Sequence, residues 1–363
     1  MARRWAVVTE TEALSTAGTP ARALSAGNVT YVVGPLATLV IVTAGDRPGD
    51  SAVQSADRLE LREPFPETVE ERLGNAAAPR LGFVRLAEGL LPLGRLRLMV
   101  SQSRSTSVDG GPWLFGGPSE LTWCELRMAD PLPFEVLDRV RPTPQQPLPD
   151  PDWLRFLPAD PVAAMRGHVA GWYADLPPAD HEPVPPDRTL PEPLLALYRA
   201  AAGRREVLGV HNSIYPWGEL ECEDDGRVQF GAENQGVFVM LFDPTGPDPV
   251  VQYEGDAPEG EGAPLSTALL QFLLSEAAIS SPFHGFATVT AAHADRLVGS
   301  LRPVPLSPDG WPGGIIRHYV APGLVATTTT PADGSVDVYA GARHRCALRA
   351  LRDPGFTWEQ FNG

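Results

Sequence analysis

The chain has 363 residues, 43% of them hydrophobic and 20% charged, and its formal net charge is −16 at pH 7. This length suits two or three domains of ordinary size. The strong negative charge, without any sizeable cluster of basic residues, excludes nucleic acid as an expected partner. An acidic chain instead attracts basic proteins, mainly by accelerating their encounter, although the same charge can serve solubility alone.

Cysteine usage and apolar runs favour a reducing, non-membrane setting. Cys124, Cys222 and Cys346 are widely spaced and form no CxxC pair, which indicates neither a disulfide framework nor a zinc site. The apolar residues near the start of the chain stop at Val8, which argues against a signal peptide. The longest apolar runs fall far short of the ~20 residues that a transmembrane helix requires. We therefore expect a cytoplasmic protein without membrane contact.

Residues 1–141 are predicted to form a separate, strand-rich N-terminal domain. Its candidate strands are short and are bounded by Gly, Pro, Asp or Ser. They lie at residues 4–8, 29–33, 37–42, 59–61, 95–101 and 121–127. Helices are expected at residues 67–73 and 133–140.

Proline repeats mark the end of this half. Residues 141–151 lack apolar periodicity, which predicts an extended connector and the first domain boundary. Apolar residues at helical spacing predict a helix at residues 161–173. A second proline-rich stretch covers residues 176–186. Residues 142–188 are therefore predicted to be a linker that carries one helix.

Residues 189–363 show an α+β pattern. A helix begins after Pro191 and ends at Gly203, and a longer one spans residues 265–279. The expected strands lie at residues 227–230, 235–242, 250–254, 315–320, 324–329 and 336–340, followed by a helix at 343–351. This order predicts one mainly antiparallel sheet flanked by helices.

The helix at residues 265–279 carries an apolar stripe. Its members recur about every four residues and are Leu265, Leu269, Leu270, Leu273 and Ala277. Polar Ser266, Gln271 and Glu276 lie elsewhere on the helix, so one buried face beneath the sheet is expected.

A dense run of acidic residues is the candidate partner-binding surface. Residues 219–261 hold twelve carboxylates and a single base, Arg227. Glu219, Glu221 and Glu223 alternate along a segment expected to be extended, which places them on one side. The full candidate set is Tyr215, Trp217, Glu219, Glu221, Glu223, Asp224, Asp225, Asn234, Glu254 and Asp256. Such a row suits the Arg and Lys side chains of a basic protein.

Each of these features also has a structural interpretation. Charges on an edge strand prevent aggregation without binding anything. Tyr215 and Trp217 are either an interface hot spot or a cover over one end of the core. Asn234 and Gln235 precede Gly236, a pattern typical of a turn or bulge.

Motifs for catalysis or metal binding are absent from the sequence. The histidines lack HExxH spacing, no Gly-x-Ser-x-Gly elbow occurs, and the glycine-rich runs lack a following Gly-Lys-Ser/Thr. The acidic run lacks the ligand spacing of an EF-hand loop. We expect no catalytic residue, no cofactor and no metal.

The order of elements after residue 189 resembles that of the SUKH superfamily. The matching features are Leu190 and Pro191, Trp217, residues 233–236, the helix at 265–279, residues 338–342, and Trp358 with Glu359. The resemblance spans residues 189–361 and does not extend to residues 1–150.

Bacterial SUKH proteins are mostly immunity proteins that neutralise toxins by tight binding, while others are regulatory or scaffolding proteins. The resemblance implies a non-catalytic protein-binding module, in the first place an immunity protein against a basic toxin. The alternative is a scaffolding or targeting adaptor, and an enzyme in the N-terminal domain is the third possibility.

Overall fold

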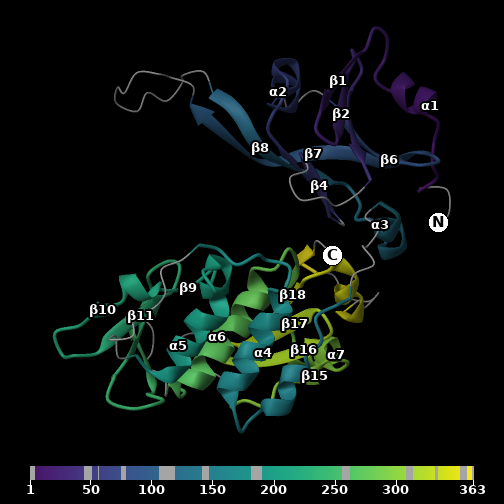
Figure 1. The fold of residues 1–363 in the computed structure, drawn as a ribbon. Helices are drawn as coiled ribbons and strands as arrows, with labels where there is room; N and C mark the ends of the chain where they lie inside the picture. The colour runs from purple at the N-terminus through teal and green to yellow at the C-terminus, as the bar shows by residue number, and fades with distance from the viewer. Residues whose placement is uncertain are drawn as a thin grey trace. The chain divides into compact units, whose positions relative to one another are not determined.

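The computed structural model describes residues 5–44, 51–55, 57–74, 79–105, 119–140, 147–180, 190–255, 262–307, 314–331, 334–351 and 358–361. The chain divides into two compact units, residues 1–144 (unit 1) and 145–363 (unit 2), each with its own hydrophobic core. Both units combine helices with sheets, which confirms the predicted α+β class and the strand-rich N-terminal part (Figure 1).

Unit 1 is built on an eight-stranded sheet. In spatial order its strands are β1 (Arg22–Ala26), β2 (Val29–Val33), β3 (Thr38–Thr43), β6 (Arg80–Leu86), β7 (Gly89–Ser105), β8 (Ser119–Met128), β5 (Arg58–Arg62) and β4 (Ala52–Gln54). Neighbours are antiparallel except β3 and β6, which run parallel. The helices are α1 (Glu10–Ser15), α2 (Glu67–Gly74) and α3 (Phe134–Val140).

Most predicted elements of unit 1 are confirmed, among them β2, β3, β5, β8 and both predicted helices. The strand expected at residues 4–8 is reduced, in its described part, to an isolated bridge between Val8 and Leu90. β1, β4, β6 and α1 were not predicted. Gly82 interrupts the apolar pattern of β6, and the six-residue α1 depends on a capping box between Thr9 and Glu12.

Unit 2 contains two antiparallel sheets where the sequence predicted one. The five-stranded sheet comprises β10 (Glu221–Cys222), β11 (Val228–Ala232), β12 (Phe238–Phe242) and β13 (Val251–Gly255), with β9 (Ser213–Ile214) also paired to β11. The six-stranded sheet has the order β15 (Arg302–Pro303), β16 (Ile315–Ala321), β17 (Leu324–Thr330), β18 (Val336–Ala342), β14 (Phe283–Val289) and β19 (Gln360–Phe361). The strands before the central helix and those after it therefore belong to different sheets.

The remaining elements of unit 2 are helical. They are η1 (Asp152–Phe156), α4 (Pro161–Trp172), α5 (Glu192–Ala201), η2 (Arg205–Leu208), η3 (Trp217–Glu219), α6 (Leu265–Ile279), α7 (Ala291–Val298) and η4 (Arg345–Leu351). The helix expected at 343–351 is thus a 3-10 helix. α7 was missed although Thr290 caps it through a hydrogen bond with the backbone N–H of His293.

α6 is the central helix of unit 2, packed against β17 and β18 and against α4 and α5 (Figure 1). Its predicted bounds are confirmed, but the prediction of a single buried face is wrong. Ser266, Gln271 and Glu276, expected off the core face, are 4%, 1% and 2% exposed. α6 is therefore buried on every side, and its polar side chains must find hydrogen-bond partners inside the core.

The boundary between the units falls at residue 144, and the described residues 147–180 belong to unit 2 instead of forming a linker. The helix expected at 161–173 is present as α4, but Met165, Val169 and Trp172 are buried in the core of unit 2. Trp153 of η1 joins the same core. The proline content concealed this packing. Residues 141–146 and 181–189, which hold much of that proline, lie outside the described residues.

Candidate functional site

The outer edge of the five-stranded sheet is formed by two short strands. β10 pairs with one end of β11 and β9 pairs with the other. The Tyr215 backbone N–H still bonds to the Phe230 carbonyl, but residues 216–220 leave the ladder and η3 forms a turn there. The predicted partner-binding segment therefore lies along a broken sheet edge.

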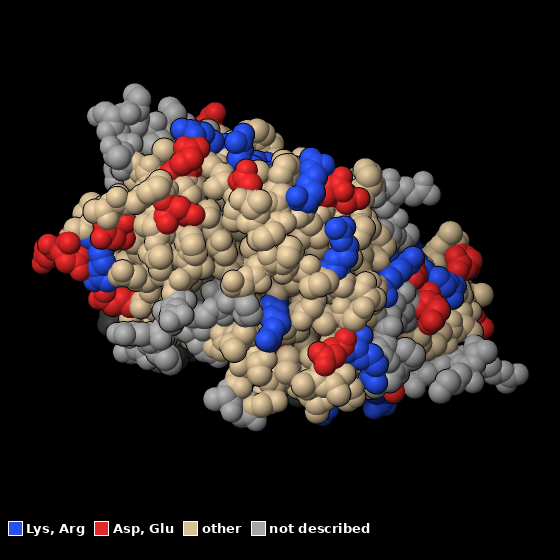
Figure 2. Space-filling model, turned by 90° about the horizontal axis from the view of Figure 1, so that it is seen from below, with Lys and Arg blue, Asp and Glu red and all other residues tan. Residues whose placement is uncertain are grey.

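Four exposed carboxylates crowd the β10 end of this edge: Glu219, Glu221, Glu223 and Asp224. We call them the acidic edge. Within the part of the chain that the structure describes, none of the four side chains forms an ion pair. Figure 2 shows acidic side chains gathered at the end of the molecule where Figure 1 labels β10 and β11.

The expected alternation along one extended segment is wrong. Glu219 ends the 3-10 turn η3, and the backbone N–H of Glu223 bonds to the Arg227 carbonyl in the turn after β10. Only Glu221 lies on a strand, which is two residues long. The carboxylates are close together because the chain turns tightly on both sides of β10.

Arg227 is already engaged by two predicted binding residues. Its Nε donates to Asp225 Oδ2 at 2.6 Å and its Nη2 donates to Glu254 Oε2 at 2.7 Å. Hydrogen bonds from the Arg227 backbone N–H and guanidinium hold the pKa of Asp225 below its ordinary value. Asp225 and Glu254 therefore hold Arg227 at the start of β11. Asp256, also a predicted binding residue, lies outside the described residues.

The two predicted aromatic residues are half-buried against the core of unit 2. The Tyr215 hydroxyl accepts a hydrogen bond from Gln229 Nε2 at 2.9 Å. The Tyr215 carbonyl accepts another from the Tyr198 hydroxyl at 2.7 Å. These contacts favour the structural interpretation, in which Tyr215 and Trp217 close one end of the core.

A cavity of about 240 Å³ in unit 2 is the second candidate site, and sequence reasoning missed it. Its lining residues are His211, Asn212, Glu233, Ser275, Ile279, Ile316, Thr327, Thr329, Asp337 and Tyr339. Three neighbouring strands supply much of the wall, because Ile316, Thr329 and Asp337 lie in one cross-strand row. Thr327 and Tyr339 are paired in the next row of the same face. The run of threonines in β17 was the available indication.

One wall of this cavity is fixed by the central helix. The Glu276 carboxylate accepts hydrogen bonds from the backbone N–H groups of Val210, His211 and Asn212, each at 2.8 Å. Asn212 Oδ1 then accepts the backbone N–H of Asn234 at 3.2 Å. The predicted binding residue Asn234 thus lies beside the cavity and away from the acidic edge.

The opposite wall carries an oriented carboxylate. Asp337 Oδ1 accepts a hydrogen bond from the Thr288 hydroxyl at 2.8 Å. The Tyr339 ring packs on Phe286, with 4.6 Å between ring centroids. Burial and the carboxylates of Asp337 and Glu359 raise the pKa of Tyr339, so its hydroxyl stays neutral and able to donate a hydrogen bond.

Ser275, which lines the cavity, forms a buried pair with His318. Ser275 Oγ and His318 Nε2 are 3.1 Å apart, a spacing also found between nucleophile and base in hydrolases. Burial lowers the pKa of His318 to about 4, which makes it a weak base at neutral pH. The pair is better explained as two buried polar groups that satisfy each other.

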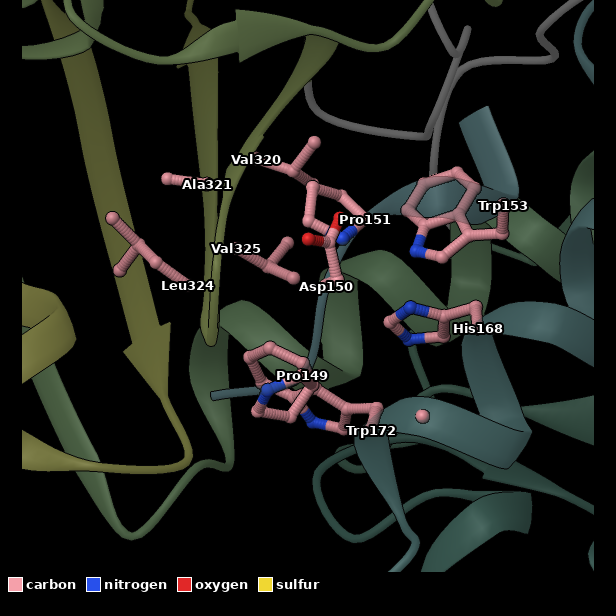
Figure 3. Close-up of a pocket in the computed structure, with 11 residues that line it drawn as sticks. Pro149, Asp150, Pro151, Trp153, His168, Trp172, Val320, Ala321, Leu324 and Val325 are labelled. Atoms are coloured by element: carbon pink, nitrogen blue, oxygen red, sulfur yellow. The ribbon is translucent and has the colours of Figure 1, made fainter. Parts of the chain in front are cut away.

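A smaller pocket lies beside His168, between η1, α4 and the β16–β17 turn (Figure 3). Its volume is about 10 Å³, which is room for about one water molecule. His168 is 2% exposed, its Nε2 has no hydrogen-bond partner in the described residues, and burial lowers its pKa to about 3. This histidine is a neutral core residue between Trp153 and Trp172.

Metal-ligating side chains do not gather in groups of three or more anywhere in the described residues. Of the described helices, none combines the length and apolar character needed to cross a membrane. The chain matches no family model, no curated protein and no solved structure.

Proposed function

We propose that this chain is a non-catalytic protein-binding module whose acidic edge holds a basic protein. The observation that carries the proposal is the contrast within one hairpin. Arg227 is occupied by Asp225 and Glu254, while the four carboxylates of the acidic edge face solvent with no ion pair in the described residues. Exposed carboxylates of this density accelerate the encounter with a basic partner and restrict which partners bind.

Within this proposal, the partner is a basic toxin domain and the chain is its immunity protein, as the SUKH resemblance implies. A small acidic surface suits this role, because charged groups at a rim act mainly on the rate of association. Neutralisation by direct binding requires no catalytic group.

The test compares three baits in affinity capture from the native cell. The first is the natural chain and the second carries Glu219→Arg, Glu221→Arg and Glu223→Arg. The third is a control that carries Asp152→Arg, Asp180→Arg and Asp295→Arg. These residues are also exposed, and the change in net charge is the same. We expect the first and third baits to capture basic proteins that the second bait does not capture.

Kinetics on a captured partner sharpen this test. The three substitutions in the acidic edge should lower the association rate more than they raise the dissociation rate. The difference in association rate between the natural chain and this variant should shrink as salt is added. Equal binding by all three baits would remove the acidic edge from the interface.

A scaffolding adaptor is the second proposal, favoured by the presence of two compact units with separate cores. Two units offer two independent binding surfaces. This role requires that a protein captured by residues 1–144 and another captured by residues 145–363 bind the full chain together. Competition between them would rule out the adaptor.

A further inference from the structure

The 240 Å³ cavity of unit 2 has the chemistry of a site for a positively charged ligand. Glu233 and Asp337 provide two carboxylates, and no Arg is among the lining residues. Both carboxylates are oriented. Glu233 Oε2 accepts the backbone N–H groups of Gln235 and Val237 at 2.7 and 3.2 Å, and Asp337 is held by Thr288.

A hydroxyl on the cavity wall gives independent evidence for a ligand. Thr327 lines the cavity and is 3% exposed, yet its hydroxyl forms no hydrogen bond within the described part of the chain. The Thr327 hydroxyl oxygen is open to the cavity, so a ligand there can donate a hydrogen bond to it.

The rest of the lining suits the carbon part of such a ligand. Ile279 and Ile316 contribute apolar surface beside the polar groups, and Tyr339 contributes an aromatic ring. An aromatic ring attracts cations that approach its face. The cavity volume of about 240 Å³ admits a short alkyl chain with one charged head.

We propose that this cavity binds an alkyl ammonium or guanidinium group. The charged head lies between Glu233 and Asp337 and donates a hydrogen bond to the Thr327 hydroxyl, while the alkyl chain packs on the two isoleucines. The group belongs either to a free small amine or to a Lys or Arg side chain of a bound protein. This inference rests on the cavity alone and does not depend on the acidic edge.

Binding to the full chain is measured by calorimetry and by NMR titration with four probes. Agmatine and butylamine carry the cationic heads, 1-butanol is the neutral counterpart and butyrate the anionic one. We expect saturable binding of agmatine or butylamine and no binding of the other two. Butanol that binds as tightly as butylamine, or absence of binding by both cations, would overturn the proposal.

Three variants locate the binding. Asp337→Asn keeps an oxygen for Thr288 and Glu233→Gln keeps one for its turn, so both should fold, and each should weaken agmatine binding about tenfold or more. Thr327→Val removes the unpaired hydroxyl with little change of shape. It should weaken agmatine binding and leave the melting temperature equal or higher, an outcome that a purely structural threonine would not give.

The acidic-edge triple variant is the control that separates this site from the proposed partner surface, and its agmatine affinity should be unchanged. A captured basic partner then identifies the source of the cation. If the partner competes with agmatine, the cavity takes a Lys or Arg side chain, and if both bind together, it takes a free amine. Unchanged agmatine binding in Asp337→Asn, Glu233→Gln and Thr327→Val would contradict the proposal.

Discussion

Glu276 Oε1 accepts the backbone N–H of Asn212 at 2.8 Å and so ties the central helix to the wall of the cavity. The same carboxylate holds Val210 and His211, so one side chain fixes three consecutive amides. Gly209 allows the chain to turn there. Its φ is 107°, and a Cβ at this position would lie 2.0 Å from the Asn212 carbonyl oxygen. The cavity is therefore built around a buried carboxylate that belongs to the core.

Removal of this carboxylate should destabilise unit 2. We expect Glu276→Ala to lower the free energy of unfolding by roughly 2–4 kcal/mol, since three amides lose an acceptor and the innermost cannot reach water. Glu276→Gln, which retains one oxygen, should cost less. Urea unfolding measures the loss, and hydrogen exchange should accelerate at residues 210–212. Exposed Glu221→Ala is the control and should change stability by less than ~0.5 kcal/mol.

Truncation of a buried leucine in α6 should also destabilise the fold. Leu269 and Leu273 are both 0% exposed, so either change to Ala should cost roughly 2–5 kcal/mol. Partner binding should suffer only through unfolding. A variant that kept its melting temperature and lost its partner would show that the helix is a recognition surface.

Stability should fall on acidification because two buried histidines are neutral in the folded chain. Burial lowers the pKa of His168 to about 3 and that of His318 to about 4, from 6.5. Between pH 6.5 and those values the unfolded chain binds more protons, so stability present above pH 6.5 is lost as the pH falls. His168→Phe, placed beside Trp172, should reduce the drop in melting temperature between pH 7.5 and pH 5. His293 is exposed, so His293→Gln should leave this drop in melting temperature unchanged. If the melting temperatures of both variants fell equally between pH 7.5 and pH 5, buried His168 would not be a source of the pH dependence.

Fragments test the boundary between the units. Residues 1–144 and residues 145–363 should each unfold cooperatively when expressed alone, since each has its own core. A fragment of residues 189–363 lacks Trp153, Met165 and Trp172 and should be much less stable than 145–363. Circular dichroism during thermal unfolding gives the comparison. Equal stability of the two C-terminal fragments would restore the boundary near residue 188.

Elements with strong local patterns could be predicted from the sequence. The strand at Val29–Val33 and the helix at Leu265–Ile279 were found with their observed bounds because β-branched residues and closely spaced leucines dominate them. Local patterns did not reveal the strand β14, and they did not show that α4 belongs to the core of unit 2. Gly285 and the polar residues His284 and Thr288 interrupt the apolar pattern of β14, and the proline-rich surroundings of α4 conceal its packing.

Of the two candidate sites, the acidic edge could be predicted from local sequence and the cavity could not. Charge density located the acidic edge, because closely spaced carboxylates are rarely buried together. The cavity was hidden, since Asn212, Ser275 and Asp337 are far apart in sequence and meet only through the packing of α6 and the strand register. Glu276, one acid in an apolar helix, was assigned to an outer face because its amide partners lie more than sixty residues away.

The cysteines of this chain offer a route to labelling. Cys124 is fully buried and its pKa is raised to about 12, so its thiol stays protonated and unreactive at neutral pH, whereas Cys346 is half-buried. Cys222 is exposed on β10, directly after Glu221. With Cys346 replaced by Ser, a maleimide dye should attach at this one position and report the approach of a partner to the sheet edge as a change in fluorescence.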